Sequence, residues 1–190
     1  MSLIKNILKN KGSEQTVFSL SELGSLSPSY VGTKLNSAVK YLVKKGELIR
    51  ISKGLYVVDK NYSRIEFANK YRVPSYISFY TILESLGIVF QPYSSIYIAS
   101  RRSEEKIIDG QKYIYRKIKD EILLNPMGID MQGQISKASP ERAICDKLYL
   151  DGIEYFDNTR NIDFEKMRLI NTKIYKNNQT ISIWISQNIK

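Results

Sequence analysis

The sequence contains no histidine, a single cysteine and no long apolar run. Without histidine, the chain has neither Ser-His-Asp nor Cys-His catalysis, and no metal site that needs an imidazole ligand. Cys145 has no second cysteine with which to form a disulfide or a metal site, which is typical of a reducing compartment. No apolar stretch reaches the roughly 20 residues that cross a bilayer. We therefore expect a cytoplasmic protein that is not an enzyme, binds no metal or cofactor and has no membrane partner.

Basic residues are in excess, and they are concentrated at one end of the chain. The sequence has 29 Lys and Arg against 19 Asp and Glu, a formal net charge of +10. Residues 1–60 hold 10 of the basic residues and only 4 of the acidic ones. Such a charge attracts polyanions, nucleic acid first. The N-terminal third is therefore the part that we expect to face nucleic acid.

The first part of the chain is expected to contain two short helices. Residues 4–8 place apolar side chains at helical spacing, and Gly12 marks the stop. A short extended piece follows at residues 17–18. Ser19 then offers a side-chain cap for a second helix, whose inward residues are Leu20, Leu23 and Leu26.

A third, longer helix is expected from Pro28 to Lys45, with Ser27 as its cap, proline in the first turn and Gly46 at its end. Its inward stripe is Val31, Leu35, Ala38, Val39 and Leu42. Two extended segments follow at residues 48–52 and 55–58, joined by a turn in which Gly54 supplies the positive φ of a tight hairpin. This order of elements indicates a winged helix-turn-helix, with a polar linker at residues 59–63.

The outward face of the third helix carries small hydroxyls, an amide and lysines, which suit base edges and phosphates in a DNA major groove. The candidate DNA-binding residues of this face are Ser29, Thr33, Lys34, Asn36, Ser37, Lys40, Tyr41 and Lys44. The hairpin, or wing, adds Arg50, Lys53 and Gly54 for backbone or minor-groove contact. Arg50 has an alternative partner in Glu47.

Residues 61–190 mix helical and extended signals. Helices are expected at residues 65–71, 74–86, 139–150 and 164–189, the last interrupted near residues 177–178. Strands are expected at residues 95–101 and 135–138, and a hairpin joins residues 106–108 to 113–116. The expected fold class is α+β: a winged helix-turn-helix over residues 1–60, then a C-terminal mixed α/β domain of antiparallel strands and helices over residues 61–190.

Carboxylates in the second domain have ordinary structural explanations. Asp109-Gly110 is what a hairpin turn requires, which weighs against a nuclease acid at that position. Ser139-Pro140-Glu141 is typical of a helix start, with serine at the cap. Asp146 lies five residues after Glu141, off its helix face, so we do not expect a paired-carboxylate active site. Arg142 and Asp146, four residues apart, are expected to pair at the surface.

Aromatic and basic residues of the second domain suggest a surface for a partner. Its many tyrosines suit either a protein interface or a small core. A candidate second basic surface could extend the DNA footprint or face an acidic or RNA-bearing partner. It consists of Arg101, Arg102, Arg116, Lys117 and Lys119.

Several segments carry a family pattern in this order along the chain: residues 38–50 (AVKYLVKKGELIR), 53–56 (KGLY), 74–78 (PSYIS), 86–87 (LG), 115–116 (YR) and 136–149 (SKASPERAICDKLY). Together they resemble the AbiEi-type antitoxins of abortive-infection and type IV toxin–antitoxin systems. Residues 151–190 are similar to that family only in their expected helical character.

The resemblance implies a bacterial cytoplasmic antitoxin used in phage defence. Such a protein is a winged-helix transcriptional regulator that binds double-stranded DNA at an inverted repeat in its own promoter, which favours a homodimer on DNA. It represses its own operon and neutralises a nucleotidyltransferase-like toxin, with or without direct contact. Two alternatives stay open: a winged-helix regulator with a sensor or partner domain and no toxin, and an enzyme such as a nuclease in residues 61–190.

Overall fold

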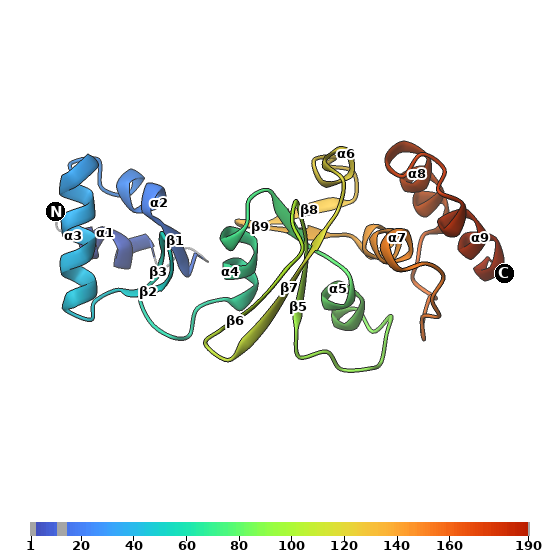
Figure 1. Cartoon of the computed structure of the whole chain (residues 1–190), viewed down its shortest axis with the longest axis horizontal. Helices are drawn as coiled ribbons and strands as arrows, with labels where there is room; N and C mark the ends of the chain where they lie inside the picture. Colours follow the sequence, from blue (N-terminus) through green and yellow to red (C-terminus); the bar gives the residue numbers. More distant parts are fainter. Residues whose placement is uncertain (1–2, 11–14, 190) are drawn as a thin grey trace. The chain divides into compact units, whose positions relative to one another are not determined.

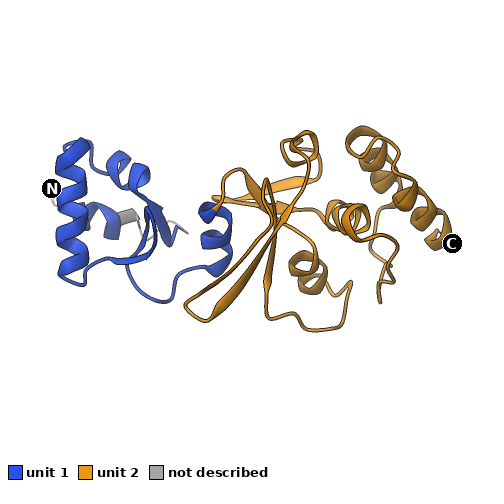
Figure 2. Ribbon diagram, viewed as in Figure 1, with its two compact units in different colours: residues 1–71 blue, residues 72–190 orange. Residues whose placement is uncertain are grey.

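The computed structural model describes residues 3–10 and 15–189. The chain divides into two compact units, Met1–Tyr71 and Arg72–Lys190 (Figure 2). This division falls later than the boundary expected at residue 60, because helix α4 (Arg64–Tyr71) packs against strand β1 (Val17–Ser19) of unit 1. The segment expected as a linker, residues 59–63, therefore lies inside unit 1, where Tyr62 is buried.

Unit 1 contains a small antiparallel sheet in the order β1-β3-β2, formed by β1, β2 (Ile49–Ser52) and β3 (Leu55–Val57). Helices α1 (Leu3–Asn10), α2 (Leu20–Ser25) and α3 (Gly32–Lys44) lie on one side of this sheet and α4 on the other (Figure 1). Ser19 caps α2 as expected. The expected stop at Gly12 lies outside the described residues. The buried core consists of Leu3, Ile7, Phe18, Leu23, Leu35, Val39, Leu42 and Leu48.

Helix α3 begins later than the sequence predicts. Ser27 does not cap it, because the Ser27 hydroxyl is bound by the Asn6 amide at 2.8 Å and residues 27–30 form a separate turn. Val31 is the residue at the N-cap, and the helix starts at Gly32, whose φ is +55°. Val31 was expected in the inward stripe but is 71% exposed, because it precedes the helix.

Unit 2 contains a mixed sheet in the order β6-β7-β5-β4-β9-β8. Its strands are β4 (Ser75–Ile77), β5 (Ile96–Ser100), β6 (Glu104–Ile108), β7 (Gln111–Lys117), β8 (Ile129–Gln132) and β9 (Ile135–Ala138). The expectation of antiparallel strands is wrong for two pairs, since β5 runs parallel to β7 and β4 parallel to β9. With helices and both kinds of pairing, the chain belongs to the α+β class.

Helix α7 (Pro140–Asp151) lies between the sheet and the C-terminal helices α8 (Phe164–Ile174) and α9 (Gln179–Asn188) (Figure 1). Helices α5 (Tyr80–Ser85) and α6 (Asp120–Leu123) complete the unit. Ser139 caps α7 as predicted, with its hydroxyl accepting from the Arg142 amide. None of the described helices is both long enough and apolar enough to span a membrane.

The helix expected over residues 74–86 is instead a strand followed by a short helix. Strand β4 is enclosed between β5 and β9, and Tyr76 and Ile77 are buried within the sheet. Pairing with two neighbours satisfies this backbone better than an isolated helix start does. Phe79, at φ +54°, is the N-cap residue of α5, which begins at Tyr80.

Arg142 and Asp146 form a buried pair and not the surface pair that their spacing suggests. Both side chains are 0% exposed, with 3.6 Å between Arg142 Nε and Asp146 Oδ1. Asp146 accepts hydrogen bonds from the hydroxyls of Tyr76 at 3.0 Å, Ser78 at 2.7 Å and Tyr175 at 2.5 Å. Burial raises the pKa of Asp146, against the opposing effects of Arg142 and these hydroxyls.

Removing the carboxylate should therefore destabilise unit 2 strongly. In Asp146→Ala, the buried Arg142 guanidinium loses its counter-charge, and we expect the free energy of unfolding to fall by about 3–5 kcal/mol. Chemical denaturation monitored by Trp184 fluorescence measures this. The matched control is Asp130→Ala, since Asp130 is exposed on β8, and a change within about 0.5 kcal/mol is expected there. Equal effects of the two changes would contradict the role assigned to the buried pair.

Candidate nucleic-acid interface

The face of α3 opposite the core is open to solvent. Leu35, Val39 and Leu42 point into the core of unit 1. The exposed set is the one that the sequence predicts, namely Ser29, Thr33, Lys34, Asn36, Ser37, Lys40, Tyr41 and Lys44. Ser29 lies in the turn before α3 and the others lie within the helix. Cations and hydrogen-bonding groups thus share one exposed surface, which we call the α3 face.

One lysine of the α3 face and the lysine that follows α3 are held against tyrosine rings. Lys34 Nζ lies 5.2 Å from the centre of the Tyr30 ring, and Lys45 Nζ lies 5.0 Å from that of Tyr41. A hydrogen bond with Tyr41 also raises the pKa of Lys45. Contact with an aromatic ring restricts where an ammonium group can sit. Tyr30 and Lys45 were missing from the predicted interface, although the Tyr-to-Lys spacing of four residues in a helical segment is a signal that identifies such pairs.

The hairpin formed by β2 and β3, which the sequence predicts as the wing, exposes Arg50 and Lys53 on the same unit. Arg50 Nε donates to the Ser52 carbonyl at 3.3 Å, so its observed partner is a backbone group and not Glu47. Gly54 has a φ of +77°, and a side chain there would meet no atom within 4 Å. The glycine at the tip of the wing is therefore required by the backbone conformation and not by a lack of space.

Hydrogen bonds of the backbone fix the wing to the helices. The amides of Glu47 and Leu48 donate to the Leu42 carbonyl at 3.0 and 3.3 Å, so that the chain turns back directly at the end of α3. The Gly54 carbonyl accepts from the Leu20 amide, at the start of α2, at 3.1 Å. These bonds make α2, α3 and the wing a single framework.

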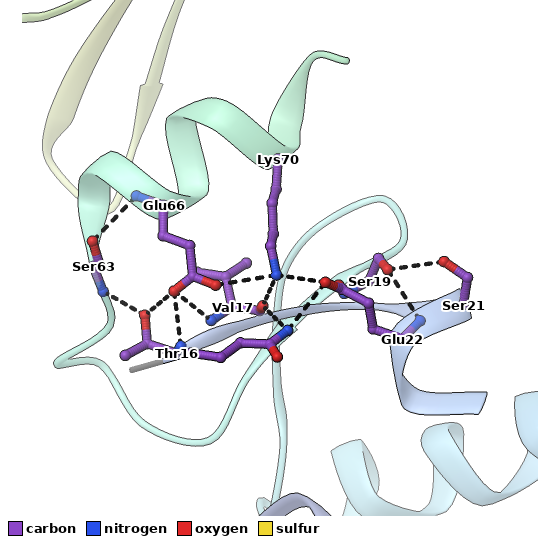
Figure 3. A network of polar contacts seen from close by, with 9 residues as sticks. Thr16, Val17, Ser19, Ser21, Glu22, Ser63, Glu66 and Lys70 are labelled. Atoms are coloured by element: carbon purple, nitrogen blue, oxygen red, sulfur yellow. Dashed lines mark hydrogen bonds and ion pairs between the residues drawn. The ribbon is translucent and has the colours of Figure 1, made fainter. Parts of the chain in front are cut away.

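A network of polar contacts joins α4 to the framework from the other side (Figure 3). Glu66 Oε2 accepts from the Thr16 amide at 2.8 Å, the Thr16 hydroxyl at 2.7 Å and the Val17 amide at 3.1 Å. Lys70 Nζ donates to the Val17 carbonyl at 2.6 Å and lies 3.1 Å from Glu66 Oε1. We call this group, together with Glu22, the α4–β1 network. It ties the last helix of unit 1 to the strand that leads into α2.

Glu22 connects the α4–β1 network to the start of α2. One of its oxygens accepts from the Ser19 amide at 2.6 Å, which completes a capping box, and the other lies 2.7 Å from Lys70 Nζ. Partial burial acts to raise the pKa of Glu22, but the hydrogen bonds from Lys70 and Ser19 outweigh it and lower the pKa. The ionised form of Glu22 therefore supports both the helix cap and the contact with α4.

The candidate second basic surface is only partly cationic. Arg101 pairs with Asp120 at 3.1 Å. Arg116 binds both carboxylate oxygens of Asp151, at 2.5 and 2.6 Å, and lies over the Phe79 ring. Arg102, Lys117 and Lys119 are exposed. Two of the five cations are therefore matched by carboxylates, and three are left to attract a polyanion.

The carboxylates considered for catalysis lie apart from one another in structural positions. Asp109 and Gly110 form the turn between β6 and β7, with φ values of +48° and +76°. Glu141 is buried, 2.8 Å from Lys166 Nζ and 2.9 Å from the Ser139 hydroxyl. Over residues 3–10 and 15–189, no group of three or more Cys, Asp or Glu side chains is arranged to hold a metal ion.

Unit 1 should lose stability when the α4–β1 network loses its cation. In Lys70→Met, Glu66 stays buried without its partner, and we expect the free energy of unfolding to fall by about 3 kcal/mol at pH 7. The lowered pKa of Glu22 means that its contribution is present above its unfolded pKa of about 4.3 and is lost as the pH falls through the folded value. The difference between wild type and variant should therefore narrow in acid.

Thermal unfolding between pH 3 and pH 7 measures this difference. The control is Lys60→Met, because Lys60 is exposed in the segment before α4. A constant gap between wild type and Lys70→Met across this pH range would contradict the coupling of Glu22 to Lys70.

Comparison with known proteins gives a likeness of fold. No protein-family model matches the sequence, and no curated protein matches it either. Among solved structures, the chain is similar to the crystal structure of the RV2827C protein from Mycobacterium tuberculosis. The two share 13% sequence identity with a TM-score of 0.51, over 98% of this chain and 77% of that chain. At this identity the likeness supports the α+β fold and carries no information on activity.

Proposed function

We propose that unit 1 is a winged helix-turn-helix that binds double-stranded DNA, and that the protein is an antitoxin that represses its own operon. The observation that carries the DNA-binding part is the α3 face, which exposes all eight of the helix and turn residues that the sequence predicts as contacts. The opposite side of α3 packs in the core of unit 1. The α4–β1 network joins the other elements of the unit to one another.

The dimensions and chemistry of the α3 face suit a major groove. Helix α3 has 13 residues, a length of about 20 Å, and a groove about 12 Å wide admits one helix. In this proposal, hydroxyls at its N-terminal end reach base edges and lysines along its flank reach phosphates. The exposed Arg50 and Lys53 of the wing then lie beside the duplex.

The antitoxin part of the proposal rests on the sequence segments that resemble AbiEi-type antitoxins. In this proposal, unit 2 serves partnership and neutralisation of a nucleotidyltransferase-like toxin, and two copies of the chain occupy the halves of an inverted repeat. A regulator with a sensor unit and no toxin is the second candidate. Two observations would favour the antitoxin over the regulator. One is a nucleotidyltransferase-like reading frame next to the gene, and the other is rescue of growth when the product of that reading frame is co-expressed with this protein.

DNA binding should depend on the lysines of the α3 face and the wing. We expect Lys34→Ala, Lys40→Ala and Lys53→Ala each to weaken binding several-fold and each to reduce the slope of log affinity against log salt by about 1. The measurement is fluorescence anisotropy with an operator selected from a random DNA pool, at several salt concentrations.

The matched control is Lys173→Ala, because Lys173 is an exposed lysine on α8 of unit 2. If the triple variant Lys34→Ala, Lys40→Ala, Lys53→Ala binds as tightly as this control and with the same salt dependence, α3 and the wing do not contact the duplex.

A further inference from the structure

Val31 lies at a helix N-cap, a position where an apolar side chain is unfavourable. It is the N-cap residue of α3, and its side chain makes no cap hydrogen bond. Ser, Thr, Asp and Asn are preferred at that position, and replacing one of them by an apolar residue typically costs about 1 kcal/mol. Val31 also leaves its methyl groups in water, with 71% of the residue exposed. Neither helix formation nor core packing explains a valine here.

The surroundings of Val31 form an uncharged tip on the α3 face. Ser29, Gly32 and Thr33 are exposed beside it, and all are small. Gly32 has a positive φ, and a side chain at that residue would meet no atom within 4 Å. Lys34, the nearest cation in sequence, is held over the Tyr30 ring. The tip therefore lets the backbone approach a ligand closely and offers it methyl groups, not charge.

The apolar group that duplex DNA exposes in its major groove is the 5-methyl group of thymine. A valine is stiff about χ1, so its two methyl groups lose little conformational freedom on contact. The N-terminal residues of a recognition helix are those that reach base edges. We propose that Val31 contacts a thymine methyl group and thereby selects thymine at one position of each half-site. This inference rests on the proposed DNA-binding function.

Deoxyuridine, which lacks only the methyl group of thymine, is the probe for this contact. In an operator selected from a random pool, each thymine is replaced by deoxyuridine in turn. Wild-type protein should lose about fourfold in affinity at one position per half-site, the value of one buried methyl group. The variant Val31→Ser should bind the thymine and deoxyuridine operators equally at that position.

Val31→Ser keeps the test clear of folding defects, because serine is a good N-cap residue and should leave the thermal stability unchanged or raise it. The matched control is Val73→Ser, since Val73 is 82% exposed in unit 2, and it should retain the fourfold preference. Specific binding with no effect of deoxyuridine at any position, or a preference that Val31→Ser retains, overturns the thymine contact and leaves DNA binding intact. Absence of any selected DNA overturns both.

Discussion

The buried pair of Arg142 and Asp146 is the constraint on which unit 2 depends. Two opposite charges taken out of water destabilise a fold unless each keeps its counter-charge and has hydrogen bonds in place of water. Asp146 accepts from hydroxyls on β4, just after β4 and at the end of α8. The two Nη groups of Arg142 donate to the carbonyls of Ile122 and Met127 at 2.7 and 2.9 Å, whereas its Nε makes no hydrogen bond and lies 3.6 Å from Asp146 Oδ1. The pair therefore fixes α7 relative to the sheet, to α6 and to α8. Displacing any one of these elements would remove hydrogen bonds from a buried charge and lower the stability of the unit.

Unit 1 uses the same device on a smaller scale. Glu66 and Lys70 are also four residues apart on one helix, and Glu66 is 1% exposed. Glu66 accepts hydrogen bonds from the backbone amides of Thr16 and Val17. Lys70 also pairs with Glu22, which is part of the capping box of α2. In the sequence, both pairs look like the surface ion pairs that are common on helices and contribute little. Only the tertiary structure decides that they are buried, because spacing along a helix specifies a shared face and not what covers it.

Features that depend on a few neighbouring residues could be predicted from the sequence. The caps at Ser19 and Ser139 and the turn at Asp109-Gly110 follow from local hydrogen bonding and φ preferences. The apolar periodicity of α3 likewise identifies Leu35, Val39 and Leu42 as its inward side. Features set by distant partners could not. Strand β4 is extended because β5 pairs with it on one side and β9 on the other. Its parallel pairing with β9 joins segments about 60 residues apart in the sequence, which local patterns do not specify. The start of α3 shifted because Asn6 of α1 engages Ser27.

Conflict between local preference and observed structure is itself informative about function. Where the local preference of a residue agrees with its tertiary contacts, stability explains its identity. A residue that is unfavourable at its position and has no compensating contact points to a role in binding. At the buried pairs the conflict is resolved within the molecule, since each charge has its partner. At Val31 the conflict has no such resolution among the described residues, because the side chain neither caps α3 nor enters the core. The lysines of the α3 face supply attraction that is the same for every sequence, so the selectivity of the proposed interface has to come from its uncharged groups, which include the Asn36 amide, the hydroxyls and Val31.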